Sequence, residues 1–193
     1  MGYTRKKRNT KNKTKKIYST KDYSSGEGML TSVWGPGMWH YLHTMSFNYP
    51  INPTATDKKK YKLCITNLQY TLPCKYCRIN LKNNFKHLPL TDACMSSRDT
   101  FSRYVYDLHE LINKMLKKKS NLTYSEVRDR YEHFRARCTS NQNKIFKFTK
   151  KHGKELGCTR PMYGHKSKCI IKIVPQSDKS KTFQMDKKCI KQK

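Results

Sequence analysis

Five successive segments of this chain carry apolar residues at intervals of three and four positions, and this spacing constrains the fold most. The longest runs through Phe101, Val105, Leu108, Ile112 and Met115. Residues spaced in this way share one face of an α-helix, and a neighbouring element must cover that face. Strand-like alternation appears only over residues 170–174. The chain therefore predicts an all-α fold, a small bundle of helices.

Caps and helix-breaking residues set the expected boundaries. A first helix should open at the Gly-Pro-Gly of residues 35–37, because proline is favoured in a first turn, and should end before Pro50. Thr56 and Asp57 are expected to cap a second helix. A third begins at the cysteine pair described below, the fourth carries the longest apolar stripe, and a shorter fifth starts at Ser125.

Charge divides the chain into a core and two basic ends. Lysine and arginine outnumber aspartate and glutamate by 42 to 13, which leaves a net charge of +29. A charge this high favours contact with nucleic acid, anionic membranes or acidic proteins. We expect a disordered basic leader over 1–28, one folded domain over 29–138, and a lysine-rich C-terminal tail of uncertain order over 139–193.

Neither a membrane span nor an export signal is expected. No stretch approaches the roughly 18–20 apolar residues of a spanning helix, and the first residues lack the apolar segment of a secretory signal. A basic tail is preferred to a transit peptide, so a cytoplasmic location is expected. Eight cysteines in such a chain argue for catalysis or metal binding rather than a secreted disulfide scaffold.

Two of these cysteines, Cys74 and Cys77, are separated by two residues and follow Pro73 at the start of the third expected helix. The unpaired N–H groups and the positive end of the helix dipole favour a thiolate there. A thiol in such a place can have its pKa lowered from about 8.5 into a range of roughly 3.5–7.5. The pair therefore predicts redox chemistry.

Three kinds of site use such a pair. A structural zinc site needs a second pair of ligands, and a thioredoxin-like site needs a βαβ setting, which the helical pattern does not offer. The third is a helical bundle that holds a cofactor able to take electrons from the dithiol. Trp39 with His43, and His109 with Asn113, each lie four residues apart and meet on one helix face. These pairs favour the third reading, a flat slot that grips an aromatic ring system.

The order of these motifs resembles the Erv/ALR family of FAD-linked sulfhydryl oxidases over about residues 34–135. Four elements of the family pattern occur in order and at suitable distances: Trp39-x-x-Leu42-His43, Tyr49-Pro50, Cys74-x-x-Cys77 and Leu108-His109-x-x-Ile112-Asn113. Large DNA viruses of the cytoplasm encode members of this family. The lysine- and asparagine-rich ends suit such an origin, with the protein in the host cytoplasm or the virion.

The resemblance implies a four-helix bundle with a short fifth helix, with FAD between the helices, and a homodimer. It implies a thiol oxidase that forms disulfides in protein substrates, or in a thioredoxin-like intermediary, and passes the electrons to oxygen to give hydrogen peroxide. By similarity, Cys77 should lie next to the flavin and Cys74 should exchange with substrate thiols. The residues expected to hold FAD are Trp39, His43, His109 and Asn113, with Lys114 and Lys118 for the phosphates and Tyr131 on the adenine side.

The chain departs from the family pattern in two places. Glu110 stands where the family usually has asparagine, which puts one polar contact to the cofactor in doubt. Tyr106 and Tyr124 stand where the family often has a disulfide that fastens the fifth helix, so packing is expected to replace that bond.

The alternative is a basic nucleic-acid-binding protein with a structural zinc site. Its candidate ligands are His152, Cys158, His165 and Cys169, whose spacing matches no zinc pattern that we recognise. Two further cysteines carry plain expectations. Cys64, on the apolar stripe of the second helix, should be buried. For Cys94, in the loop after the redox helix, a free thiol is favoured over one that approaches the active pair.

Overall fold

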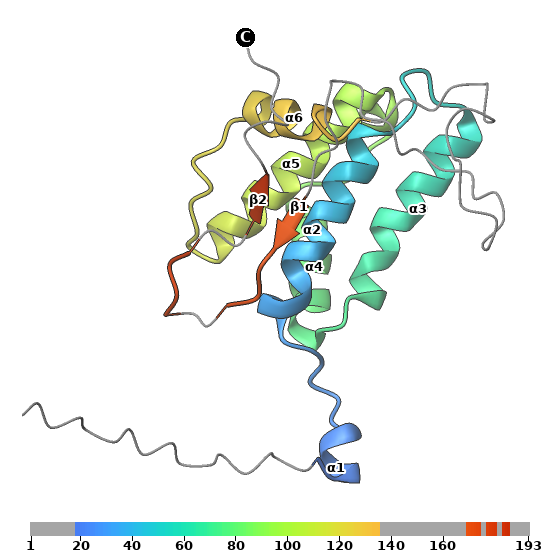
Figure 1. Ribbon diagram of the computed structural model, residues 1–193. Helices are drawn as coiled ribbons and strands as arrows, with labels where there is room; N and C mark the ends of the chain where they lie inside the picture. Colours follow the sequence, from blue (N-terminus) through green and yellow to red (C-terminus); the bar gives the residue numbers. More distant parts are fainter. Residues whose placement is uncertain (1–17, 136–168, 175–176, 181–182, 186–193) are drawn as a thin grey trace, which may run out of the picture.

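Helices α2 to α5 lie side by side and form a bundle (Figure 1). The structure, a computed structural model, describes residues 18–135, 169–174, 177–180 and 183–185. The bundle helices are α2 (Thr31–Phe47), α3 (Ala55–Thr71), α4 (Lys75–His87) and α5 (Arg98–Met115). A 3-10 turn, η1 (Ala93–Met95), precedes α5, and α6 (Tyr124–Glu132) packs against α2 at one end of the bundle. The predicted four-helix bundle with a short fifth helix is confirmed.

Three short elements lie outside the bundle. A single turn, α1 (Thr20–Tyr23), falls in the leader, where no helix was expected. Two strands, β1 (Cys169–Ile171) and β2 (Phe183–Met185), pair antiparallel with Ile170 opposite Gln184. β1 overlaps the strand-like residues 170–174 of the expected tail. The described residues include no helix that is both long and apolar enough for a bilayer.

Capping boxes begin four of the described helices, α1, α3, α5 and α6. At α3 the Thr54 hydroxyl accepts from the Asp57 N–H at 3.1 Å, and the Asp57 carboxylate accepts from the Thr54 N–H at 2.9 Å. The cap expected at Thr56 is therefore wrong, because the N-cap is Thr54, and Asp57, the third residue of the helix, reaches back to it. Equivalent boxes start α5 and α6: Ser97 with Thr100, and Thr123 with Glu126.

The start of α2 also differs from the expectation. The helix begins at Thr31, before the Gly-Pro-Gly that was expected to open it, and Pro36 lies inside it. The Val33 N–H donates to the Leu30 carbonyl at 2.9 Å, so the first turn closes before the proline is reached. Pro36 then costs the helix one hydrogen bond without preventing the turn that precedes it. Thr31 is thereby fixed at the helix start, which matters for the site.

The core gathers around α5. Phe101, Val105 and Leu108 are buried as predicted, whereas Met115, at the last position of α5, is 41% exposed. Ile65 of α3 is buried against this cluster. Its neighbour Cys64 is exposed, so the prediction that Cys64 is buried is wrong: successive residues on a helix point about 100° apart, and Ile65 takes the inward position.

Tyrosine packing joins α5 to α6 where the family pattern would place a disulfide. The Tyr106 and Tyr124 rings meet edge to face with centroids 5.8 Å apart. The Tyr106 hydroxyl donates to the Leu122 carbonyl at 2.7 Å, and the Tyr124 hydroxyl lies 2.8 Å from the Ser102 hydroxyl. The expectation that packing replaces the disulfide is confirmed.

Candidate active site

The cysteine pair opens α4, as the sequence predicted. Cys74 is the N-cap residue, and its sulfur accepts a hydrogen bond from the Cys77 N–H at 3.3 Å. Both side chains are free thiols of intermediate exposure. The N–H groups of the first turn therefore point toward the pair, in the place where an anion is most stable on a helix.

The two sulfurs differ in acidity. The hydrogen bond from the Cys77 side chain is the main cause that lowers the pKa of Cys74. Burial, followed by the hydrogen bond with Cys74, raises the pKa of Cys77. In the reduced pair Cys74 therefore loses its proton first, and Cys77 shares its own proton with the Cys74 thiolate.

A segment far away in the sequence is pinned against this pair. Gly28 forms an isolated antiparallel bridge with Cys74, and the Met29 N–H donates to the Pro73 carbonyl at 2.6 Å. Gly28 has φ +94°, and a Cβ at this position would lie 2.5 Å from the Pro73 carbonyl oxygen. Three residues on, the Thr31 hydroxyl lies 3.4 Å from the Cys77 sulfur. We name residues 28–31 the brace.

Aromatic and imidazole rings gather between α2, α5 and α6. The Trp39 and His109 rings stack with centroids 3.8 Å apart and planes tilted by 7°, and His43 Nε2 lies 2.9 Å from His109 Nδ1. The His43 and Tyr131 ring centroids lie 5.3 Å apart. Four residues predicted to bind the cofactor are thus one cluster. The expected slot does not lie between Trp39 and His109, because rings 3.8 Å apart admit nothing between them.

Burial keeps both imidazoles neutral. It lowers the pKa of His43 to about 3, with a smaller contribution from His109, and the pKa of His109 to about 4. One imidazole therefore donates to the other without a net charge. His43 Nδ1 is buried with no hydrogen-bond partner among the described residues. A buried polar atom of this kind is available to a ligand that brings a donor or acceptor.

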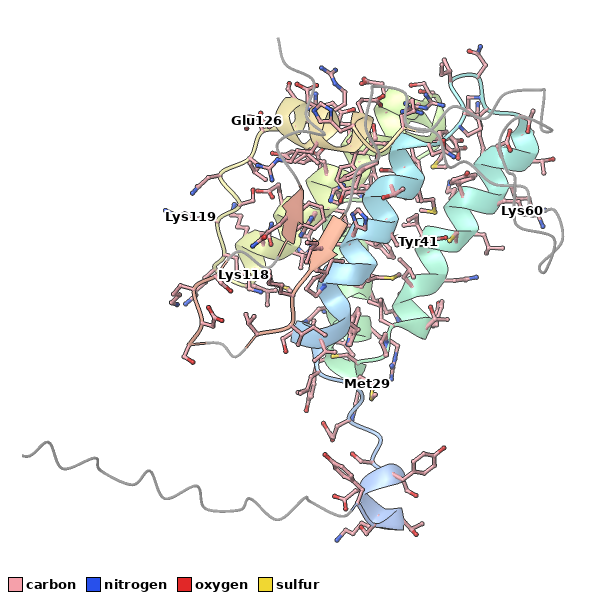
Figure 2. All side chains as sticks on the ribbon, viewed as in Figure 1. Met29, Tyr41, Lys60, Lys118, Lys119 and Glu126 are labelled. Atoms are coloured by element: carbon pink, nitrogen blue, oxygen red, sulfur yellow. The ribbon has the colours of Figure 1, made fainter. Side chains whose placement is uncertain are left out.

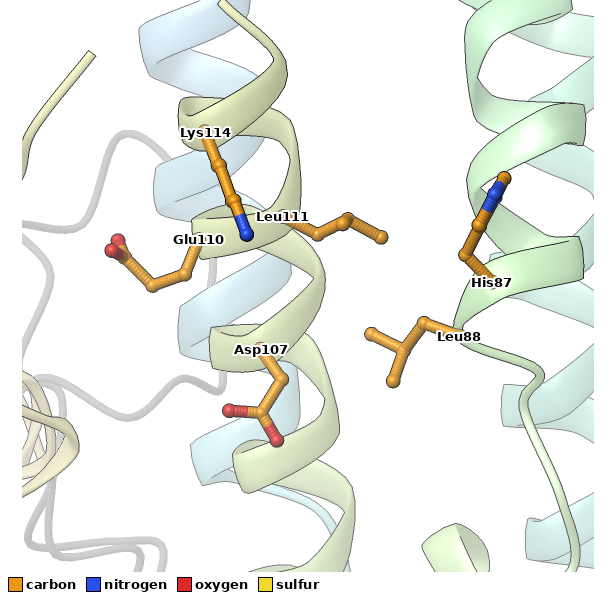
Figure 3. Close-up of a pocket in the computed structure, with 6 residues that line it drawn as sticks. All are labelled: His87, Leu88, Asp107, Glu110, Leu111 and Lys114. Carbon is orange, nitrogen blue, oxygen red and sulfur yellow. The ribbon is translucent and has the colours of Figure 1, made fainter. Parts of the chain in front are cut away.

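The remaining predicted cofactor residues lie along the second half of α5 and beyond it. Asn113 donates from Nδ2 to Glu110 Oε1 at 3.0 Å, so Glu110 makes a polar contact within the chain where the family has asparagine. Lys114 and Glu110 border a hollow of about 450 Å³ between α5 and the end of α4 (Figure 3). Lys118 follows α5 (Figure 2) and borders a second hollow of about 570 Å³. That hollow is also lined by Lys114, Lys117 and Lys119.

Several residues near the site were not predicted from the sequence. His40 Nδ1 lies 3.2 Å from the Tyr131 hydroxyl, and the His40 ring lies 5.4 Å from Phe183 of β2. His40 is three residues before His43, so helical spacing could have indicated it. Nothing in the sequence indicated Thr31, which is 46 residues from Cys77.

The zinc alternative falls largely outside the described residues. His152, Cys158 and His165 are not described, and of Cys169 only the backbone, in β1, is described.

Cys94 is a free thiol, as predicted; its sulfur lies 3.3 Å from the Thr91 hydroxyl.

These features fit one kind of ligand. Planar rings with neutral imidazoles and an unpaired buried nitrogen suit the faces and edges of a flat heteroaromatic group. The lysine-lined hollow beside the same helix suits phosphate groups. The dithiol opens the neighbouring helix α4. The residues present therefore fit a ring-bearing, phosphorylated redox cofactor.

Comparisons with known proteins identify relatives over the bundle. A family model described as "Erv1 / Alr family" matches residues 36–132. A probable FAD-linked sulfhydryl oxidase of Acanthamoeba polyphaga mimivirus is 38% identical over 99 residues, which are 51% of this chain and 68% of the relative. A putative FAD-linked sulfhydryl oxidase of Invertebrate iridescent virus 6 is 30% identical, over 45% of this chain and 81% of the relative. The crystal structure of the yeast Erv1 core aligns with a TM-score of 0.49 at 19% identity, covering 63% of this chain and 96% of that chain.

Proposed function

Because the chain belongs to the Erv1/Alr family, we propose that it is an FAD-linked sulfhydryl oxidase that forms disulfides in protein substrates through Cys74 and Cys77. The observation that carries the proposal is the cysteine pair at the N-terminus of α4, in which the pKa of Cys74 is lowered and that of Cys77 is raised. We propose oxygen as the terminal acceptor and hydrogen peroxide as the product, because relatives in the family are named oxidases.

The ring cluster and the lysines would hold the cofactor. Trp39, His43, His109 and Tyr131 would contact the ring systems of FAD, with His43 Nδ1 as a polar contact. Asn113 would contact a polar ring edge, and Lys114 and Lys118 would bind the phosphates. When bound, FAD accepts an electron pair from a dithiol and passes it to an acceptor such as oxygen.

The cysteines carry out thiol–disulfide exchange. In the oxidised pair a substrate thiolate attacks Cys74 Sγ: the Cys74–Cys77 bond breaks, a substrate–Cys74 bond forms, and the electron pair stays on Cys77 as a thiolate. A second substrate thiolate then attacks the substrate sulfur of this mixed disulfide and releases Cys74. The Cys77 N–H, which donates to Cys74 Sγ at 3.3 Å at the start of α4, favours Cys74 as the leaving thiolate in this step. Substrate leaves as a disulfide, and the chain holds the two electrons as a dithiol.

We also propose that the protein is a homodimer that uses the outer faces of α2 and α3. Tyr41 lies on α2 (Figure 2), and Leu63 and Tyr70 lie on α3. Tyr41 is 56% exposed, and Leu63 and Tyr70, which share a face of α3 at a spacing of seven, are 50% and 69% exposed. An exposed apolar surface of this kind suits a second copy of the chain. Sedimentation equilibrium tests the proposal, and a monomer at micromolar concentration would refute it.

The viral source of relatives supports the cytoplasm of an infected cell, or the virion, as the location. The charge of +29 supports acidic proteins or nucleic acid as additional partners, and a thioredoxin-like protein is a candidate intermediary. Immunolocalisation in infected cells tests the first point, and labelling confined to an organelle would contradict it. Binding to an acidic partner that did not weaken with salt would contradict the second.

Oxygen consumption with dithiothreitol tests the enzymatic proposal. The wild-type chain should bind flavin, consume oxygen and release peroxide, whereas Cys77→Ala should bind flavin without turnover. Cys64→Ala is the matched control, because Cys64 is an exposed thiol on α3, and it should turn over like wild type. Turnover by Cys77→Ala, or a wild-type protein that is colourless and inert, would overturn the proposal.

A further inference from the structure

The brace joins the start of α2 to the cysteine pair through three described links. Gly28 bridges Cys74, the Met29 N–H donates to the Pro73 carbonyl, and the Thr31 hydroxyl lies 3.4 Å from the Cys77 sulfur. The first two fix the backbone beside the pair, and the third reaches a sulfur atom that reacts. The brace lies before residues 36–132, the part of the chain that the family model matches.

The direction of the Thr31–Cys77 hydrogen bond depends on the protonation state of the sulfur. While Cys77 is a thiol, either atom can donate. Once Cys77 is a thiolate it has no proton, so the Thr31 hydroxyl is the donor. A hydrogen bond to an ionised acceptor is roughly twice as strong as one between neutral groups. The contact therefore strengthens at the moment when Cys77 becomes negatively charged.

We propose that Thr31 is a third member of the redox site, whose hydroxyl stabilises the Cys77 thiolate that forms when a substrate thiol attacks Cys74. This inference rests on the proposed function for the role of that thiolate. In the step, the substrate sulfur bonds to Cys74 Sγ, the bond between Cys74 and Cys77 breaks, and its electron pair passes to Cys77 Sγ. Thr31 gives no proton away; it keeps its O–H and directs it at the new charge.

Such a donor is useful because burial and the neighbouring Cys74 both disfavour a negative charge on Cys77. In the reduced pair burial raises the pKa of Cys77, the hydrogen bond with Cys74 raises it further, and the hydrogen bond with Thr31 lowers it. When Cys74 is bonded to substrate sulfur, its thiolate is absent and its effect on Cys77 ends. Burial then still opposes the Cys77 charge, while the α4 N-terminus and Thr31 favour it.

The position of Thr31 follows from the fold. As the first residue of α2 it has helical backbone geometry, and its β-branched side chain has few rotamers there. Gly28 lets the chain approach within contact of Pro73 and Cys74, where a side chain would collide. The hydroxyl is therefore held at the sulfur by the backbone on both sides of it.

The test measures the pKa of Cys77 directly. In full-length protein carrying Cys74→Ser, which keeps an N-cap oxygen at the start of α4, the alkylation rate of Cys77 by iodoacetamide is followed against pH. Mass spectrometry of the peptide that contains Cys77 separates it from the other thiols. Thr31→Val, which removes the donor at nearly constant shape, should raise the apparent pKa by about one unit, a tenfold loss of thiolate at a given pH below it.

Two further variants make the result specific. Thr31→Ser retains a hydroxyl and should titrate like the parent, and Ser32→Ala removes the adjacent exposed hydroxyl and should also leave the pKa unchanged. Equal pKa values for Thr31→Val and Thr31→Ser would overturn the inference. The measurement needs neither flavin nor turnover, so an inactive wild-type protein would overturn the proposed oxidase function separately.

Discussion

At the scale of single residues, the neutral imidazole pair makes stability depend on pH. His43 and His109 have pKa values lowered by burial to about 3 and about 4, below the 6.5 of an unfolded chain. Between these values the unfolded chain binds protons that the folded chain does not, so stability falls as pH decreases from about 6.5 toward 4. At about 1.4 kcal/mol per pKa unit, each buried imidazole lowers the free energy of unfolding by about 2 kcal/mol at pH 5.

Urea unfolding at pH 7 and pH 5 measures this loss. The wild-type midpoint should drop over that interval, and His43→Gln should lose about half of the drop although it is less stable at both pH values. His87→Gln changes an exposed imidazole at the end of α4 and should keep the full drop. An identical drop in wild type and His43→Gln would show that His43 is not held neutral.

A substitution at Gly28 should disturb the brace alone. An alanine Cβ there would lie 2.5 Å from the Pro73 carbonyl oxygen, at a φ of +94° that alanine rarely adopts. Gly28→Ala should detach the brace rather than unfold the bundle. Hydrogen exchange should therefore accelerate at the Met29 amide, which donates to Pro73. Gly26→Ala, where a Cβ meets nothing within 4 Å, is the control, and equal exchange in both variants would refute the prediction.

At the scale of elements, the tyrosine contact between α5 and α6 should behave as a coupled pair. Edge-to-face rings contribute about 0.5–1.5 kcal/mol beyond the area they bury. A double-mutant cycle of Tyr106→Ala and Tyr124→Ala should give a coupling free energy of that size. Thermal unfolding of the four proteins measures it. Additive effects would mean that the rings do not substitute for the missing cross-link.

The sequence predicted the elements that bury a periodic face. The four bundle helices and α6 were predicted from apolar intervals and caps. An apolar repeat at intervals of three and four over several turns is compatible with little other than a helix. The first turn of α2 was not predicted. Proline is a strong indicator of a helix start, so Pro36 placed the expected start after residues 31–34, whose own sequence indicates a helix only weakly. α1 and β2 are too short for any periodicity to show, whereas β1 overlaps the alternation over residues 170–174.

At the scale of the whole molecule, the sequence predicted the parts of the site that are close together on one helix. Cys74 with Cys77, and Trp39 with His43, are such pairs. The approach of His109 to Trp39 required the fold, although the motif order indicated it. Thr31 could not be found from sequence, because its relation to Cys77 depends on where α2 begins and on how the brace crosses Pro73. Contacts between distant segments carry no local pattern.

We propose that electrons from thiols enter the protein through the Cys74–Cys77 pair and reach bound flavin. Absorbance of the purified protein under anaerobic conditions, with dithiothreitol added, tests it most directly. The oxidised-flavin band of the wild-type protein should disappear and return when oxygen is admitted, whereas Cys77→Ser should keep the band over the same period. A protein without a flavin band, or equally fast bleaching in Cys77→Ser, would contradict the account.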